Sequence, residues 1–182
     1  MPATADIFAR TPNGVFVETG SYLGDGIQAA LDAGFQRVIS IELSDKYYAL
    51  CQERFANDVR VTLVQGDSAL ILGEVISQIS TNITFWLDGH YSAGDTAQGV
   101  VMIPLLEELQ AIADHPIKTH TLLIDDMRCW KDFNPAHGFQ ETDVLAALHK
   151  IREDVPLEWI DSPHAPRDIL IARFAESTIP TN

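Results

Sequence analysis

Three aspartates follow short apolar runs and are candidates for binding a cation together. Asp88 follows one such run, and Asp125 and Asp126 follow the next. Because like charges in one pocket repel unless protons or a cation neutralise them, three neighbouring carboxylates would favour a bound ion. Carboxylate oxygens are hard ligands, which Mg²⁺ and similar divalent cations prefer. The alternative for Asp126 is a turn cap or an ion pair with Arg128.

A glycine-bearing loop, residues 18–26, follows the apolar run Val15-Phe16-Val17. Its glycines Gly20, Gly24 and Gly26 permit a tight turn and the close approach of a ligand to the backbone. A helix behind the turn would present free N–H groups to a carboxylate. The glycine spacing differs from the dinucleotide fingerprint G-x-G-x-x-G, and no Gly-Lys-Ser/Thr of a phosphate-binding loop follows. The alternative is an ordinary turn that contains glycines.

Two further acidic positions have the chemistry to recognise a nucleoside. Glu42 ends the second apolar run, where a carboxylate can accept two hydrogen bonds from a ribose diol. The alternative is a solvated carboxylate at a strand end. Gly66-Asp67-Ser68 follows the third run and could reach the edge of an adenine. Asp67 or Ser68 also suits the first position of a helix, and both roles can hold together.

The elements that position these side chains alternate along the chain. We predict parallel strands over 15–17, 37–41, 59–64, 83–87 and 119–124, helices over 26–33, 45–55, 69–79, 103–113 and 142–151, and two final strands over 157–160 and 168–174. Alternation of strands and helices predicts a parallel sheet with helices on both faces. The last two strands are joined without a helix and must be antiparallel. In such sheets, ligands bind at the carboxyl ends of the strands.

Composition limits the class of ligand. The chain has 26 Asp and Glu against 12 Lys and Arg, which gives a formal net charge of −14. A nucleic-acid binder needs a basic face, and an acidic membrane surface is disfavoured for the same reason. A small neutral or cationic ligand, or a metal ion, fits better. Solubility alone is the alternative explanation for most of the charge.

The size of the chain indicates one domain. Its 182 residues, 46% of them hydrophobic, suffice for a core in a single domain over 1–182. Cys51 and Cys129 are far apart in the sequence, so no disulfide framework is expected. The sequence shows neither a membrane span nor an apolar signal region, and we expect a cytoplasmic protein.

Together, residues 17–24, Ile41-Glu42-Leu43 and Gly66-Asp67-Ser68 resemble successive motifs of the class I S-adenosylmethionine (SAM) methyltransferases. More narrowly, they are similar to those of the metal-dependent O-methyltransferases, which include the catechol, macrolide-sugar and cephalosporin-type enzymes. The resemblance covers about residues 15–127. It implies a Rossmann-like methyltransferase fold, a three-layer α/β sandwich with a doubly wound, mostly parallel seven-stranded sheet and a C-terminal antiparallel hairpin.

The resemblance also implies an activity and a set of site residues. The activity is methylation of a small hydroxylated metabolite or sugar, with SAM as cofactor and Mg²⁺ or a similar divalent cation. The metal ligands would be Asp88, Asp125 and Asp126. The SAM-binding residues would be Glu18, Thr19, Gly20, Ser21, Tyr22, Gly24, Glu42, Leu43, Asp67, Ser68 and Asp88.

Asp88 and His90 are the candidate catalytic residues. A metal-bound hydroxyl has a lowered pKa, and the neutral imidazole of His90 can take its proton near pH 7. The catechol enzyme instead uses a lysine three positions beyond the aspartate, where this chain has Tyr91. The identity of the base is therefore open, and His90 could instead stack on adenine or orient its loop.

What covers the site is a second departure from the family, because few residues precede Val15. The segments 91–99 and 127–140, or a second copy of the chain in a homodimer, could serve as the cover. The alternatives for residues 91–99 and for Trp130 are a plain surface loop and plain packing. Three other functions remain open: a metal-independent methyltransferase, a non-catalytic SAM-binding module and, remotely, a nicotinamide-dependent oxidoreductase.

Overall fold

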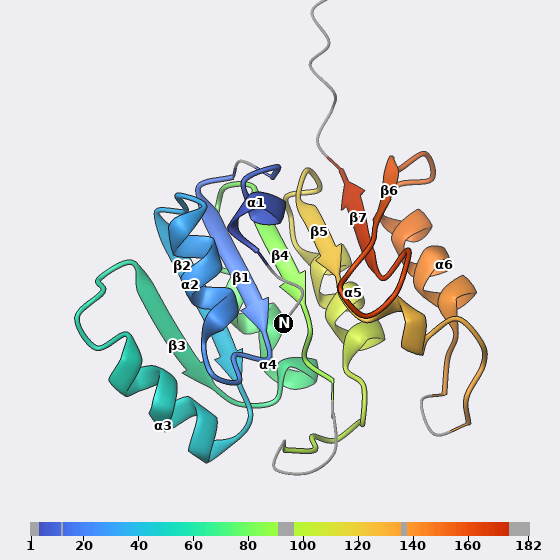
Figure 1. Ribbon diagram of the computed structural model, residues 1–182. Coiled ribbons are helices and arrows are strands. Elements are labelled where there is room, and N and C mark those ends of the chain that lie inside the picture. The colour runs from blue at the N-terminus through green and yellow to red at the C-terminus, as the bar shows by residue number, and fades with distance from the viewer. Residues whose placement is uncertain (1–3, 12, 91–96, 136–137, 175–182) are drawn as a thin grey trace, which may run out of the picture.

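Seven strands form one sheet in the order β3-β2-β1-β4-β5-β7-β6. The computed structural model describes residues 4–11, 13–90, 97–135 and 138–174. Figure 1 shows the strands side by side across the molecule. Their bounds are β1 Val15–Thr19, β2 Arg37–Glu42, β3 Val61–Gln65, β4 Ile83–Leu87, β5 Thr121–Ile124, β6 Leu157–Ile160 and β7 Ile169–Arg173.

The pairing of the strands confirms the predicted sheet. The first five strands run parallel, and β1 pairs with both β2 and β4. The chain therefore turns back across its own start between β1 and β4, which makes this the topological switch point. The strand β7 lies between β5 and β6 and runs antiparallel to both. The second strand of the C-terminal hairpin, β7, therefore lies inside the sheet, and its first strand, β6, forms the sheet edge.

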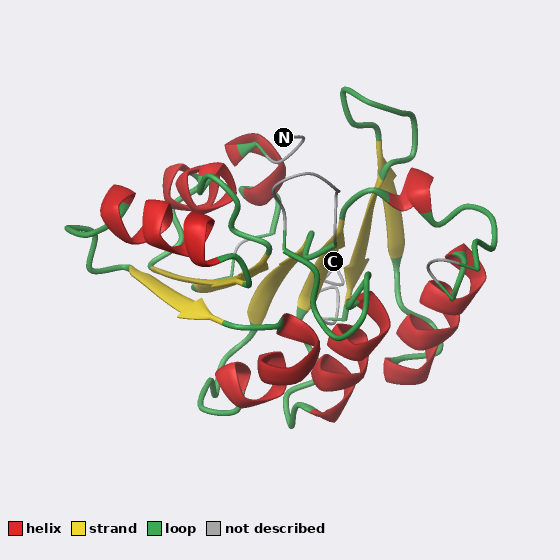
Figure 2. Ribbon diagram, turned by 90° about the horizontal axis from the view of Figure 1, so that it is seen from below, coloured by secondary structure: helices red, strands yellow, loops and turns green. Residues whose placement is uncertain are grey.

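Helices cover both faces of the sheet, as Figure 2 shows from the side of the carboxyl ends of the parallel strands. One core cluster joins the helices α1, α2 and α3 to side chains such as Phe16, and the other joins α4, α5 and α6 to side chains such as Val17. Successive residues of a strand point to opposite faces, which explains this division. The bounds are α1 Ala5–Phe8, α2 Asp25–Asp32, α3 Asp45–Arg54, α4 Ser68–Ile76, α5 Leu105–Asp114, the 3₁₀ turn η1 Met127–Cys129 and α6 Glu141–Ile151.

Several predicted boundaries were wrong by a few residues, for local reasons. The third strand starts at Val61, because a turn precedes it in which Asp58 accepts from the backbone N–H groups of Arg60 and Val61. The predicted helix over 103–113 is α5, which starts after Pro104; the proline is the N-cap residue and does not occupy the first turn. The helix α4 ends at Ile76, whose carbonyl oxygen lies 3.1 Å from His115 Nε2.

The short helix α1 was not predicted, because four residues show no helical period. It places Phe8 in the core against Phe16 and Trp86, with ring centroids 4.7 and 5.3 Å away. None of the helices in the described part of the chain has the length and apolar character needed to cross a membrane.

Candidate cofactor and metal site

The ends of β1 and β4 lie in contact at the switch point. Thr19 and Leu87 are register partners, so the segments that follow them start side by side. Gly20 has a φ of +83°, and a Cβ there would lie 2.6 Å from the carbonyl oxygen of Asp88. A glycine at this position satisfies both demands, the positive φ and the close approach of a neighbouring backbone. The structure therefore brings Gly20 and Asp88 together as the sequence predicted.

The loop between β1 and α2 depends on its glycines and on a hydrogen bond to β2. Gly24 also has a φ of +83°, and a Cβ there would lie 2.6 Å from the ring of Phe55. Gly24 caps α2 without a side chain, which leaves the first turn of this helix open to a ligand. The hydroxyl of Ser21 lies 2.6 Å from that of Ser40 on β2.

Glu18 lies beneath this loop and is almost fully buried. Its Oε2 accepts from Ser40 Oγ at 2.5 Å, and a Cβ at Gly26 would overlap its Oε1. Burial raises the pKa of Glu18 to about 8, with a further contribution from the charge of Glu42. The carboxyl group packs against the first turn of α2, so it supports the loop from behind. Its predicted contact with the cofactor remains a prediction.

Glu42 joins the end of β2 to the glycine loop. Its carboxylate accepts from the backbone N–H of Tyr22 at 2.8 Å and from that of Ser44 at 2.7 Å. Tyr22 is half-exposed with a φ of +48°, and its ring centroid lies 4.4 Å from that of Tyr47, with the two ring planes tilted by 49°. Leu43 is partly buried next to Glu42. These residues lie together at the carboxyl ends of β1 and β2, and their contact with a ribose stays a prediction.

Asp67 and Ser68 follow β3 and start α4. Asp67 is the N-cap, and its Oδ1 accepts from Ala69 N at 3.0 Å. The predicted capping role is thus confirmed. Its Oδ2 accepts from Val100 N at 2.7 Å, which ties the segment before α5 to this end of the sheet. The contact of these residues with adenine stays a prediction.

The predicted acidic residues lie around His90. His90 Nε2 is 3.0 Å from Asp126 Oδ2, and His90 Nδ1 is 3.5 Å from Asp88 Oδ1. Ligand atoms of these three residues lie within 4.8 Å of one another, as do those of Asp125, Asp126 and Asp168. Asp126 belongs to both groups. The predicted set of Asp88, Asp125 and Asp126 is therefore divided between two adjoining groups.

Asp168 is a residue of this site that the sequence analysis placed only within a predicted strand. It is fully buried just before β7, and Arg128 donates to it from both its backbone and its side chain. Ser162 Oγ donates a further hydrogen bond. Arg128 also pairs with Asp126, which confirms the alternative given above for that aspartate. Arg128 thus bridges two acids of the cluster.

Burial and mutual repulsion disfavour the ionised forms of Asp88 and Asp125. Burial raises the pKa of Asp88 well above its usual range, and the charges of Asp125 and Asp126 add to the effect. Burial and the charge of Asp126 raise the pKa of Asp125 to about 7. A cation bound between these groups would reverse both shifts, because it favours their charged forms.

Trp130 forms one wall of this region. Its ring meets that of His90 edge-on at 5.7 Å and that of Phe139 at 5.4 Å. It lines a cavity of about 10 Å³ together with Asp88, Gly89 and Asp125. Trp130 thus packs against Phe139 and also borders the acidic group. Tyr91, the segment 91–96 of the expected cover, and His137 lie outside the described residues.

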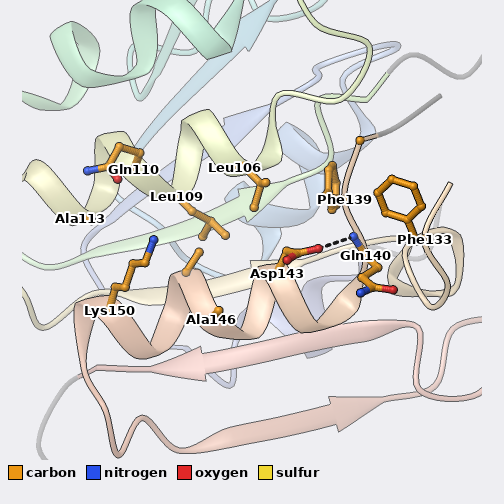
Figure 3. A pocket seen from close by; sticks show the side chains of 12 residues that line it. Leu106, Leu109, Gln110, Ala113, Phe133, Phe139, Gln140, Asp143, Ala146 and Lys150 are labelled. Carbon is orange, nitrogen blue, oxygen red and sulfur yellow. Dashed lines mark hydrogen bonds between the residues drawn. The ribbon is translucent and has the colours of Figure 1, made fainter. Parts of the chain in front are cut away.

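A wider groove lies elsewhere, between α5 and α6. Its volume is about 620 Å³, and its walls include Leu106, Leu109 and Lys150 (Figure 3). Asp143 at one end of it accepts from the backbone N–H of Gln140, as part of the capping box of α6. None of the predicted site residues lines this groove.

Neither cysteine forms a disulfide, as expected. Cys51 is buried and its Sγ donates to the carbonyl of Tyr22 at 3.3 Å. Burial raises its pKa to about 12. Cys129 is exposed as a residue. Partial desolvation of its thiol, together with the charge of Asp126, raises its pKa as well. Raised pKa values leave both thiols as weak nucleophiles.

Comparison with known proteins supports the fold. No protein-family model and no curated protein sequence matches the chain. Among solved structures, the O-methyltransferase TomG from Streptomyces achromogenes, in complex with SAM, has a TM-score of 0.66 and 13% identity, over 94% of this chain and 78% of that one. The chain has the Rossmann-like methyltransferase fold.

Two other methyltransferase-fold structures agree with this assignment. CalS10, a SAM-bound amino pentose methyltransferase from Micromonospora echinaspora, has a TM-score of 0.58 and 13% identity, over 94% of this chain and 88% of that one. The pyocyanin biosynthetic protein PhzM has a TM-score of 0.57 and 16% identity, over 95% of this chain and 55% of that longer one. The structural likeness thus spans the whole described sheet at low sequence identity.

Proposed function

We propose that the chain is a SAM-dependent methyltransferase that methylates an oxygen of a small hydroxylated metabolite or sugar, assisted by a divalent cation. The observation that carries this proposal is the switch point. There, the glycine loop after β1 meets the backbone of Asp88 after β4, in a fold shared with the SAM-bound O-methyltransferase TomG and the SAM-bound amino pentose methyltransferase CalS10. In folds of this kind the ligand binds at that point.

In this proposal, the ribose lies at Glu42, the adenine lies near Asp67 and Ser68, and the methionine carboxylate lies at the open first turn of α2. Support comes from their positions at the ends of β2, β3 and β1. Each oxygen of the Glu42 carboxylate accepts one backbone hydrogen bond and keeps a further lone pair that could accept from a ribose hydroxyl. The full SAM-binding set is the one that the resemblance implied.

The acidic cluster fits a divalent cation by its chemistry. Asp88, Asp125 and Asp126 would hold it, and Asp126 belongs to both of the adjoining groups in which the structure places these carboxyl groups. The two raised pKa values favour this assignment, since the carboxyl groups gain from a nearby positive charge. When bound, such an ion orients the acceptor hydroxyl and lowers its pKa.

His90 is placed to accept the acceptor proton. Methyl transfer is an in-line displacement, in which the acceptor oxygen bonds to the methyl carbon while the carbon–sulfur bond breaks. The hydroxyl proton must leave, and the imidazole would take it as the general base, with its ring oriented by Asp126, whose Oδ2 lies 3.0 Å from His90 Nε2. Asp88 would hold the histidine in place. A small hydroxylated acceptor is thus the expected partner.

A second candidate is a metal-independent methyltransferase of the same fold. It is favoured by one observation: positive side chains already lie among the acids, with Arg128 between Asp126 and Asp168. If Arg128 and a protonated His90 supply enough positive charge, no ion is required. The two candidates differ in their response to a chelator.

Calorimetry with SAM and with NAD⁺, followed by turnover on a panel of catechols and hydroxylated sugars, tests these proposals. We expect SAM to bind and S-adenosylhomocysteine to form only with Mg²⁺ or a similar ion. Full turnover in excess chelator, and in Asp125→Asn, would select the metal-independent enzyme. SAM binding without turnover on any acceptor would indicate a binding module, and affinity for NAD⁺ alone would overturn the assignment. Sedimentation with and without SAM tests the homodimer.

A further inference from the structure

Glu108 is a buried acid on the core side of α5. Leu105, Leu109 and Ile112 share this side of the helix, and Glu108 is only 1% exposed. Helical spacing favours a leucine at such a position, since a buried carboxyl group is costly even when it is hydrogen-bonded. Burial raises the pKa of Glu108 to about 7, which reflects this cost. Packing alone does not explain the residue.

Three segments of the candidate site converge on the Glu108 carboxyl group. Ser68 Oγ, at the start of α4, donates to Glu108 Oε1 at 2.6 Å. The hydroxyl of Thr19, at the end of β1, donates a second hydrogen bond. A Cβ on Gly89 would lie 3.0 Å from Glu108 Oε1, so the backbone after β4 passes directly over the group. One carboxyl group thus contacts three strand ends of the crevice.

The contact with Thr19 extends to Asp88. Thr19 Oγ1 accepts from the backbone N–H of Asp88 at 3.3 Å. A hydroxyl has one proton to donate, and here Glu108 accepts it, which turns the oxygen lone pairs toward the Asp88 amide. The hydrogen bonds therefore run from Asp88 through Thr19 to Glu108. Loss of the carboxyl group would free the Thr19 hydroxyl to rotate.

We propose that Glu108 is a positioning residue that fixes the segment Asp88-Gly89-His90 against the cofactor-binding ends of β1 and α4. It acts through Thr19, Ser68 and Gly89, and contacts no reacting atom. Glu108 would thereby hold the proposed acceptor side at a fixed position relative to the proposed cofactor side. The roles of cofactor side and acceptor side rest on the proposed function, whereas the effect of Glu108 on the position of His90 can be measured without it.

The test uses variants of one helix. Glu108→Leu places the residue that the helical spacing favours, and Glu108→Gln keeps an oxygen that accepts from Ser68 and Thr19. Glu107→Leu makes the same change at the exposed neighbour and is the matched control. Thr19→Val removes the hydroxyl link from the other side. It serves as the second variant if Glu108→Leu does not fold.

The readouts are the His90 imidazole NMR resonance at fixed pH, thermal unfolding, and SAM affinity by calorimetry. In Glu108→Leu we expect a shifted His90 resonance and a roughly tenfold weaker Kd for SAM, without a fall in unfolding temperature. Thr19→Val should shift the resonance similarly, and Glu108→Gln should largely restore it.

An unchanged His90 resonance in both Glu108→Leu and Thr19→Val would overturn the proposal. So would an equal shift in Glu107→Leu, or a loss of SAM affinity that merely follows a loss of folded protein. If wild-type protein binds no SAM, the proposed function fails, while the His90 resonance still tests the positioning role.

Discussion

Acid is expected to destabilise this protein through a buried pair of histidines at the opposite edge of the sheet. His120 Nδ1 accepts from Ile83 N at 3.1 Å, so its Nε2 carries the proton and donates to His115 Nδ1 at 2.9 Å. His115 Nε2 in turn faces the carbonyls of Ile76 and Ile79, each at 3.1 Å. Every ring nitrogen has a partner only while His120 is neutral.

The magnitude follows from the pKa of His120. Burial, with contributions from His115 and Lys118, lowers this pKa from 6.5 to about 4. Between these values the unfolded chain binds a proton that the folded protein excludes, so stability falls as pH falls through this window. The full loss corresponds to roughly 3 kcal/mol, with about 2 kcal/mol of it reached at pH 5.

Urea unfolding at a series of pH values, followed by circular dichroism, measures the effect. Buried carboxyl groups such as Glu18 have raised pKa values and contribute the opposite slope, so the wild-type curve alone is not sufficient. His120→Gln keeps a hydrogen-bonding side chain that does not titrate. The free energy of unfolding of wild type minus that of His120→Gln should fall by about 2 kcal/mol from pH 7 to pH 5. Parallel curves for the two proteins would refute the reasoning.

Three other predictions concern the crevice. Gly20→Ala should destabilise the fold by about 1–3 kcal/mol and abolish measurable SAM binding in calorimetry, because its Cβ would overlap the Asp88 carbonyl at a φ of +83°; unchanged binding would contradict this. Glu18→Gln should gain stability over wild type as pH rises from 4.5 toward 8, by roughly 3–5 kcal/mol in chemical denaturation, since in that window the unfolded wild-type chain ionises Glu18 while the folded protein keeps it protonated; a pH-independent difference would count against the raised pKa. Arg128→Met should destabilise the fold by about 3 kcal/mol or more, because it leaves Asp126 and the buried Asp168 without the guanidinium group that pairs with both. Added Mg²⁺ should restore part of the lost melting temperature. A variant as stable as wild type without added ion would show that the Arg128 bridge is unimportant.

Local pattern was enough to predict the sheet and much of the crevice. The runs 83–87 and 157–160 were located to the residue, because they are short apolar segments with clear limits. The contact of Gly20 with Asp88 followed from the general rule that parallel strands end at one edge. The capping role of Asp67 followed from its position before a helix.

Residues whose role depends on tertiary contacts were missed. The helical spacing of α5 places Glu108 on the apolar side, but its contacts with Ser68 and Gly89 come from elements far away in the sequence. Asp168 reaches the acidic group because β7 inserts between β5 and β6, an order that one sequence does not reveal. The spacing of the three predicted aspartates likewise gave no sign that Arg128 would bridge one of them to a fourth.

The inward position of β7 has a consequence for how the molecule forms. Asp168 immediately precedes this strand, and it anchors Arg128, which in turn offsets the charge of Asp126. The glycine loop and Glu42 follow strands near the start of the chain, whereas the charge balance of the acidic residues awaits a strand that arrives late during synthesis. A nascent chain would therefore complete the two halves of its pocket at different times, with the acidic half last.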